Sequence, residues 1–138
     1  MPLRRVVLDS NIYVSALQFG GIADEVVSAG MDGQYAVIAS ELIRSEVEET
    51  LRRKFKWDEE RLALLDAGLW SATILVSSQR SVEVCRDPRD NHLLATSREA
   101  GADFLVSGDK DILVLLRFEG TQIVSLRTFA DELASDRR

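Results

Sequence analysis

Short apolar runs alternate with longer amphipathic segments along the whole chain. Continuous apolar runs are typical of strands buried on both faces, whereas apolar residues spaced three and four apart indicate helices. The apolar runs predict five strands, at residues 4–8, 35–39, 74–76, 104–107 and 122–125. The amphipathic segments predict helices at residues 11–19, 23–29, 40–55, 58–72 and 88–101, and another from residue 128 onward.

Residues that favour helix ends support these boundaries. Ser40 and Asp58 precede helical segments and are suited to accept hydrogen bonds from the first helical amides. Asp87 is followed by a proline at the first helical position, and Gly101 follows the end of the same segment. The Gly20-Gly21 pair separates the first two helices.

Alternating strands and helices indicate an α/β protein. We expect residues 1–138 to form a single domain with a central, mostly parallel, five-stranded sheet and helices on both faces. No internal repeat or linker divides the sequence. In such sheets the functional site lies beyond the carboxyl ends of the strands. Asp9, Asp109 and Asp111 each follow the end of a predicted strand.

Two further acidic residues lie on the inward faces of predicted helices. With about 100° per residue, Glu46 falls between Leu42 and Ile43 on the apolar face of its helix. Asp90 falls in the middle of the inward stripe of the helix that follows Asp87. The same projection places the only histidine, His92, on the polar side.

Carboxylates that converge on one edge of a sheet repel one another, so they need hydrogen bonds or a cation. Mg²⁺ and Mn²⁺ prefer carboxylate oxygens, and such ions activate water for displacement at phosphorus. Each residue also has a simpler explanation. Asp9 and Asp111 could cap helices, Asp90 could interact with a helix dipole, and Glu46 could be a boundary residue. Asn11 could be a turn or cap residue and Ser107 a strand-end hydroxyl.

Composition restricts the possible partners. The 23 acidic and 17 basic residues give a net charge of −6, which argues against a broad basic platform for nucleic acid. No apolar run approaches the roughly 18 residues that span a bilayer, and the N-terminus has too short an apolar run for a signal peptide. We therefore expect a cytoplasmic protein. The single cysteine, Cys85, excludes an internal disulfide and is a poor nucleophile candidate, because His92 is the only histidine that could act as its base.

The sequence resembles the PIN domain family over nearly its whole length and in order. The matching segments are VVLDSNI at 6–12, ASELIRSEVEETL at 39–51, DPRDNHLLATSREAGADFLVSGDKDIL at 87–113 and IVSLRTFADEL at 123–133. The chain is most similar to the small stand-alone bacterial and archaeal PIN proteins that are classed as toxins of toxin–antitoxin pairs. The resemblance implies a Mg²⁺- or Mn²⁺-dependent ribonuclease fold.

Carried over residue by residue, the resemblance implies that Asp9, Glu46, Asp90 and Asp109 hold the ion and are the catalytic set. Asp111 is a second candidate ligand, because many toxin-type relatives have an asparagine and then an aspartate with a different spacing. Asn11 and Ser107 match supporting positions, and Asp87 is better explained as a helix cap.

These observations lead to a metal-dependent endoribonuclease as the first hypothesis. The family implies RNA as the substrate, a homodimer and a small antitoxin as a possible partner. The basic residues that could contact RNA are Arg44, Arg52, Arg53, Lys54 and Lys110. The alternative is a weakly active or inactive PIN protein that acts as an RNA-binding or regulatory module. A response-regulator-like phosphate site is disfavoured, because Asp9-Ser10 replaces the acidic pair expected after the first strand.

Overall fold

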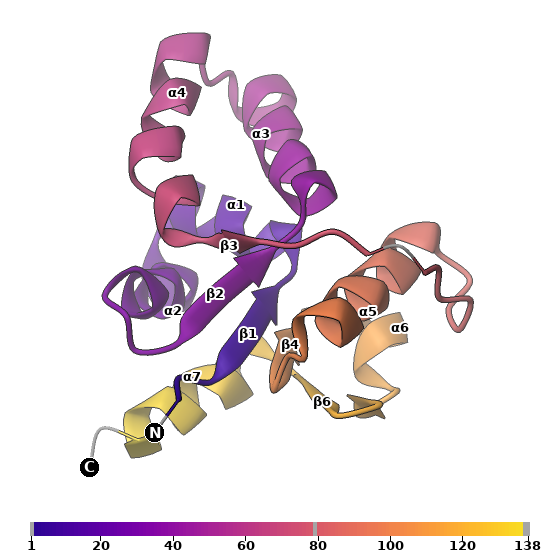
Figure 1. Cartoon of the computed structure of the whole chain (residues 1–138). Coiled ribbons are helices and arrows are strands. Elements are labelled where there is room, and N and C mark those ends of the chain that lie inside the picture. The colour runs from indigo at the N-terminus through magenta and orange to yellow at the C-terminus, as the bar shows by residue number, and fades with distance from the viewer. Residues whose placement is uncertain (1, 79, 137–138) are drawn as a thin grey trace.

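The computed structural model describes residues 2–78 and 80–136 (Figure 1). Within these residues six strands form one sheet in the order β3-β2-β1-β4-β6-β5. All neighbouring strands are parallel except β5 and β6, which are antiparallel. The strands are β1 (Arg5–Leu8), β2 (Ala36–Ala39), β3 (Ile74–Leu75), β4 (Phe104–Val106), β5 (Arg117–Phe118) and β6 (Thr121–Val124).

Helices cover both faces of the sheet. Figure 1 shows α5 in front of the sheet and α1, α2 and α7 behind it, with α3 and α4 extending beyond one end. The helices are α1 (Ser10–Phe19), α2 (Gly21–Met31), α3 (Glu41–Phe55), α4 (Glu59–Ala67), α5 (Pro88–Ala100), α6 (Lys110–Leu113) and α7 (Leu126–Asp136), with a short 3₁₀ turn, η1, at Trp70–Ala72. The predicted α/β class is confirmed.

The prediction of five strands was wrong, because it did not include β5. This two-residue strand lies between Leu116 and Glu119, which both have positive φ values, and forms a hairpin with β6. The helix predicted at residues 58–72 instead ends at Ala67, and the 3₁₀ turn η1 follows after Gly68. Helices α2 and α7 begin two residues earlier than predicted.

The core is centred on β1 and β4, whose apolar residues are fully or almost fully buried. Behind the sheet, the Phe129 ring packs edge to face against Tyr35, with 5.2 Å between ring centroids. Helix α2 packs so closely on β2 that a Cβ at Gly30 would collide with Val37 and Tyr35. Within the sheet Leu8 of β1 pairs with Val106 of β4, and this register brings the residues after β1 and β4 together.

Candidate metal centre

Asp9 lies immediately beyond the central strand β1. Its amide donates to the carbonyl of Val106 at 3.0 Å, which extends the β1–β4 pairing. The buried Ser107 hydroxyl donates to Asp9 Oδ2 at 2.8 Å, and the Ser10 hydroxyl donates to Oδ1 at 3.3 Å. Asp9 occupies the N-cap position of α1, yet its side chain accepts no capping hydrogen bond. Helix capping therefore does not explain this carboxylate.

Asp109 follows β4 and caps α6. Its Oδ1 accepts a hydrogen bond from the Asp111 amide at 2.9 Å, while its own amide donates to Ser107 Oγ at 3.0 Å. The suggestion that Asp111 could be the cap was wrong, because α6 begins at Lys110 and places Asp111 inside its first turn. One buried hydroxyl, that of Ser107, thus connects Asp9 with the loop that carries Asp109.

Asp90 is the most deeply buried carboxylate of the group, with 5% of the residue exposed. It lies in the first turn of α5, which begins at the cap residue Asp87. Burial is the main cause that raises the pKa of Asp90 to about 6, and the negative charges of Asp109, Asp87, Asp9 and Asp111 add to it. Among the described residues none donates a hydrogen bond to its carboxylate. The dipole of α5 therefore does not cancel the rise in the pKa of Asp90 that burial and the neighbouring carboxylates cause.

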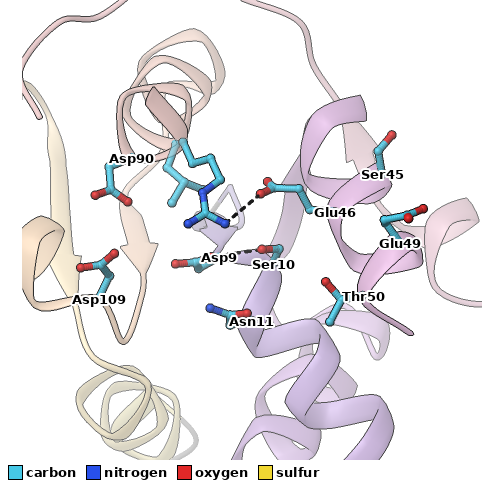
Figure 2. A pocket seen from close by; sticks show the side chains of 11 residues that line it. Asp9, Ser10, Asn11, Ser45, Glu46, Glu49, Thr50, Asp90 and Asp109 are labelled. Carbon is cyan, nitrogen blue, oxygen red and sulfur yellow. Dashed lines mark hydrogen bonds and ion pairs between the residues drawn. The ribbon is translucent and has the colours of Figure 1, made fainter. Parts of the chain in front are cut away.

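Asp90, Asp109 and Asp111 form a compact acidic cluster. Each can place one carboxylate oxygen so that all three oxygens lie within 4.8 Å of one another. Figure 2 shows Asp90 and Asp109 facing each other across the cleft, with Asp9 beside them. Three oxygens at this separation could bind a single divalent cation, which would neutralise their mutual repulsion.

Glu46 reaches toward the same cleft from α3 (Figure 2). Its side chain is 25% exposed, and Arg89 Nη1 lies 4.0 Å from its Oε2. Burial raises the pKa of Glu46, the Arg89 charge lowers it, and the charges of Asp9 and Asp87 raise it further. Leu42, which was predicted to share the buried face of α3, is 44% exposed. Glu46 consequently lies at the edge of the buried face and points along the cleft.

The cleft has a volume of about 390 Å³. Of the predicted site residues, Asp9, Asn11, Glu46, Asp90 and Asp109 line it directly. Ser107 is buried behind the wall, where it supports Asp9, and Asp111 adjoins Asp90 and Asp109. The remaining lining residues are Ser10, Ser45, Glu49, Thr50, Arg89 and Leu93.

The placement of His92 on the polar side of α5 was wrong. His92 is half-buried, and its Nε2 lies 2.6 Å from Ser40 Oγ and 3.3 Å from Thr96 Oγ1. Burial lowers its pKa. Cys85 is also half-buried, and burial followed by the negative charges of Asp90 and Asp109 raises the pKa of its thiol. A thiol held in its neutral form is a poor nucleophile, as expected from the sequence.

Comparison with protein families decides the identity of this fold. The family model described as PIN domain matches residues 5–111. This chain belongs to the PIN domain family. The match includes Asp9, Glu46, Asp90 and Asp109.

Two proteins illustrate the similarity outside the family model. An uncharacterized protein of Methanocaldococcus jannaschii, MJ1680, is 26% identical over 116 residues, which cover 80% of this chain and 74% of that protein. The crystal structure of PAE2754 from Pyrobaculum aerophilum superposes with a TM-score of 0.57 at 15% identity and covers 98% of this chain and 99% of that one. The second comparison shows that a solved structure shares this fold over nearly the whole chain.

Membership of the PIN family points to a general class of activity. PIN domains are generally nucleases that use divalent metal ions on a nucleic acid substrate. The acidic cluster of this PIN domain is compatible with binding of such an ion. None of the helices formed by the described residues is long and apolar enough to cross a membrane.

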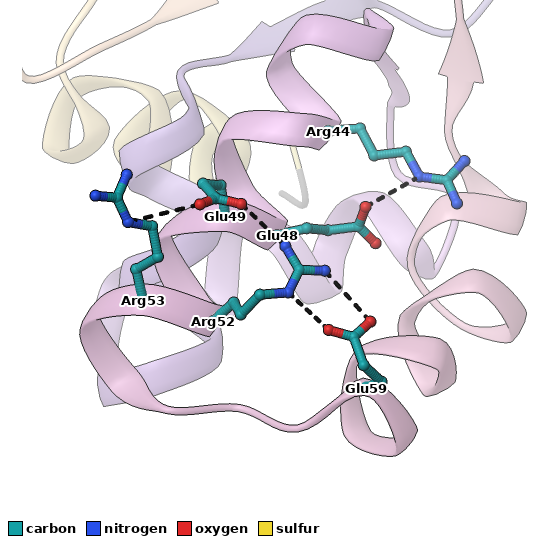
Figure 3. A network of polar contacts seen from close by, with 6 residues as sticks. All are labelled: Arg44, Glu48, Glu49, Arg52, Arg53 and Glu59. Carbon is teal, nitrogen blue, oxygen red and sulfur yellow. Dashed lines mark hydrogen bonds and ion pairs between the residues drawn. The ribbon is translucent and has the colours of Figure 1, made fainter.

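All three arginines that we assigned to RNA contact form ion pairs in this PIN domain. Figure 3 shows Arg44, Arg52 and Arg53 in contact with glutamates of α3 and α4. Arg44 also pairs with Asp66. Lys54 is exposed, as is Lys110 beside the acidic cluster. The prediction from sequence did not weigh these ion pairs, although Glu48 and Glu49 lie three and four residues from the arginines on the same helix; only Glu59 and Asp66 come from the neighbouring α4.

Sequence reasoning missed Arg89, the cation that lines the cleft. It pairs with Asp87 at 3.4 Å and lies near Glu46. The available signal was its position directly before Asp90, which places the two side chains on adjoining faces of α5.

Proposed function

We propose that this PIN domain is a Mg²⁺- or Mn²⁺-dependent endoribonuclease that hydrolyses RNA phosphodiester bonds. The observation that carries the proposal is the convergence of four carboxylates from separate elements on one cleft. Asp9 follows β1, Glu46 lies on α3, Asp90 on α5 and Asp109 after β4. Asp90 is buried, Asp9 and Glu46 are half-buried and Asp109 is exposed, and so much negative charge around a partly buried cleft requires compensation.

The donor set fits a hard divalent cation. All the candidate ligands are carboxylates, the ligand type that Mg²⁺ and Mn²⁺ prefer. Asp90 and Asp109 would hold the ion together with Asp9 or Asp111, and Glu46 would face it from α3. When bound, an ion at this position would polarise a phosphodiester and make a water molecule more acidic.

The chain's own residues would position the substrate and the ligands. Ser107 fixes Asp9 through its hydroxyl, and Asn11 offers an exposed amide at the cleft wall. Arg89, 71% exposed on its side chain, is placed to donate hydrogen bonds to a phosphate oxygen. Glu46, whose pKa is raised, is suited to accept a proton from a nearby water.

Replacement of Asp9 tests the proposal. Asp9→Asn preserves size and can still bind Ser107, but it removes the charge. We expect cleavage of an RNA oligonucleotide to fall more than about 100-fold, beyond the range of a supporting residue, while circular dichroism and melting temperature stay close to those of the wild type. Asp131→Asn, at an exposed position on α7, is the matched control and should leave cleavage unchanged. Metal-dependent cleavage retained by Asp9→Asn would contradict the assignment.

A DNA oligonucleotide of the same sequence tests the substrate class. Efficient cleavage of the DNA and not the RNA would contradict the ribonuclease proposal. Tight RNA binding without cleavage, at any concentration of Mg²⁺ or Mn²⁺, would instead favour an RNA-binding or regulatory module.

We also propose that the protein is the toxin of a type II toxin–antitoxin pair, acts as a homodimer in the cytoplasm, and is silenced by a small antitoxin. This proposal rests on the similarity to stand-alone PIN toxins. Induced expression should arrest growth, and Asp9→Asn should remove the arrest. Growth that is unaffected by the wild-type protein at full expression would argue against a toxin.

A further inference from the structure

A second open space continues from the acidic cleft along α3. Glu49 and Thr50 line both the cleft and an adjoining cavity of about 360 Å³, whose other walls are Arg53 and Lys54. The two spaces therefore form one path from the carboxyl edge of the sheet toward the C-terminal end of α3.

Helices α1 and α3 both begin at the carboxyl edge of the sheet and pack against each other. Side chains four residues apart share one face of a helix. Glu46, Thr50 and Lys54 form such a row on α3, and they line the cleft and the adjoining cavity, while Asn11 lines the cleft from α1. We call the cleft and the adjoining cavity together the α1–α3 groove; Phe19 of α1 lies against Phe55 beside its far end.

The far end of the α1–α3 groove combines aromatic and cationic side chains. Phe19 is 73% exposed, and its ring meets that of Phe55 edge to face with 5.6 Å between the centroids. Residues 52–56 read RRKFK, so four of five positions are basic in a chain of net charge −6. The Arg53 side chain is 77% exposed, and its ion pair with Glu49 is long, at 3.6 Å.

Exposed aromatic rings among cations are suited to a single-stranded nucleic acid. Unpaired bases stack on aromatic side chains, while cations contact the phosphates. A duplex keeps its bases stacked inside the helix and offers no free base face to Phe19. A polyanion also complements the basic segment better than a protein surface of ordinary composition does.

On the basis of the proposed nuclease function, we propose that the α1–α3 groove binds single-stranded RNA on one side of the scissile phosphate. Phe19 stacks on an unpaired base two helical turns from the acidic cleft, and Arg53 and Lys54 contact the neighbouring phosphates. The groove thereby selects unpaired RNA as the substrate.

The test measures binding without cleavage. Fluorescence anisotropy in EDTA follows a labelled single-stranded RNA and an RNA duplex of the same length. Phe19→Ala should weaken single-strand affinity roughly 5- to 150-fold, the effect of losing one stacked base, while Phe19→Trp should retain the affinity. Leu64→Ala, which removes a side chain that is 69% exposed on α4, is the control and should have no effect.

A charge variant tests the phosphate contacts. Lys54→Gln should reduce the slope of log affinity against log salt concentration by about 0.7, the value for one phosphate contact with a single strand. Arg127→Gln, at an exposed position on α7, should leave the slope unchanged.

The groove assignment is overturned if Phe19→Ala binds single-stranded RNA within about twofold of the Leu64→Ala control. A Phe19→Ala protein that changes its oligomeric state by light scattering and keeps its RNA affinity would assign Phe19 to a protein interface instead. Because EDTA prevents cleavage, these results do not depend on the outcome for Asp9→Asn.

Discussion

Two groups of charged side chains at α3 have opposite surroundings. On the outer surface, Arg52 donates to Glu59 at 2.7 Å and pairs with Glu49 at 3.0 Å (Figure 3). In the cleft, Glu46 lies near the negative charge of Asp9, and Arg89, at 4.0 Å, is the only cation among the described residues that line the cleft (Figure 2).

The carboxyl pKa values shift in opposite directions in the two groups. Hydrogen bonding to Arg52 lowers the pKa of Glu59 on the surface. Burial and neighbouring acids raise the pKa of Asp90 to about 6 in the cleft. A carboxyl group is therefore stabilised in its charged form in one region and destabilised in that form in the other. A cation that is not part of the chain would remove this difference.

The largest expected effect comes from removing Asp90. Asp90→Asn should abolish Mn²⁺ binding in calorimetry and lower RNA cleavage more than about 100-fold, because it deletes the carboxylate shared by the cleft and the acidic cluster. Glu59→Gln, the matched surface change, should leave both measurements unchanged. If the two variants bound Mn²⁺ with equal affinity, the cleft would not differ from the surface network as a metal site.

The pH dependence of stability in the metal-free protein should reveal the strain at Asp90. Its folded pKa, about 6, exceeds the ordinary value of 3.8, so the folded state binds more protons between these values. The free energy of unfolding should therefore fall as pH rises from about 4 to about 6, by an Asp90 contribution on the order of 2–3 kcal/mol.

Chemical denaturation in EDTA at several pH values measures this contribution. Asp90→Asn should flatten the profile and be more stable than the wild type above about pH 6. Saturating Mn²⁺ should raise the free energy of unfolding of the wild type but not that of Asp90→Asn. An unchanged profile in Asp90→Asn would mean that other groups, such as Glu46 and His92, control the pH dependence.

Sequence patterns located the cleft because its position follows from backbone geometry. Parallel pairing of Leu8 with Val106 brings Asp9 and Ser107 together, and helical periodicity alone directs Asp90 inward. Both rules depend only on residue spacing. The α/β class and the acidic edge of the sheet could be predicted for this reason, whereas the PIN family was recognised from the resemblance of ordered segments.

Features that depend on contacts between distant elements could not be predicted. Leu42 is 44% exposed because no described residue covers it fully at the start of α3, and β5 depends on positive φ values at Leu116 and Glu119. The choice of Asp109 as the cap of α6 follows from where this short helix begins. Each of these features depends on where an element begins to within one residue, or on which neighbouring element covers a side chain. Periodicity in the sequence determines neither.

A smaller effect is expected from replacing Ser107, the buried residue that supports the cleft wall from behind. Ser107→Ala removes the hydroxyl that binds Asp9 Oδ2 and accepts from the Asp109 amide. Both carboxylates then lose orientation but keep their charge, so RNA cleavage and Mn²⁺ affinity should fall about tenfold. Titration with Mn²⁺ at fixed RNA concentration separates a loss of metal affinity from a misfolded protein. The loss should be smaller than that of Asp90→Asn, and an equal loss would mean that Ser107 itself is a ligand.

The smallest effect is expected where charges are already paired. Arg52→Gln breaks the contacts with Glu49 and Glu59, but all three groups are exposed, and water and salt can replace an exposed partner. Any change in melting temperature should therefore be small and should disappear at high salt, and RNA cleavage should be retained. Scanning calorimetry at low and high salt measures this change. A large, salt-independent loss of stability would mean that the surface network, like the cleft, holds charges that the solvent cannot compensate.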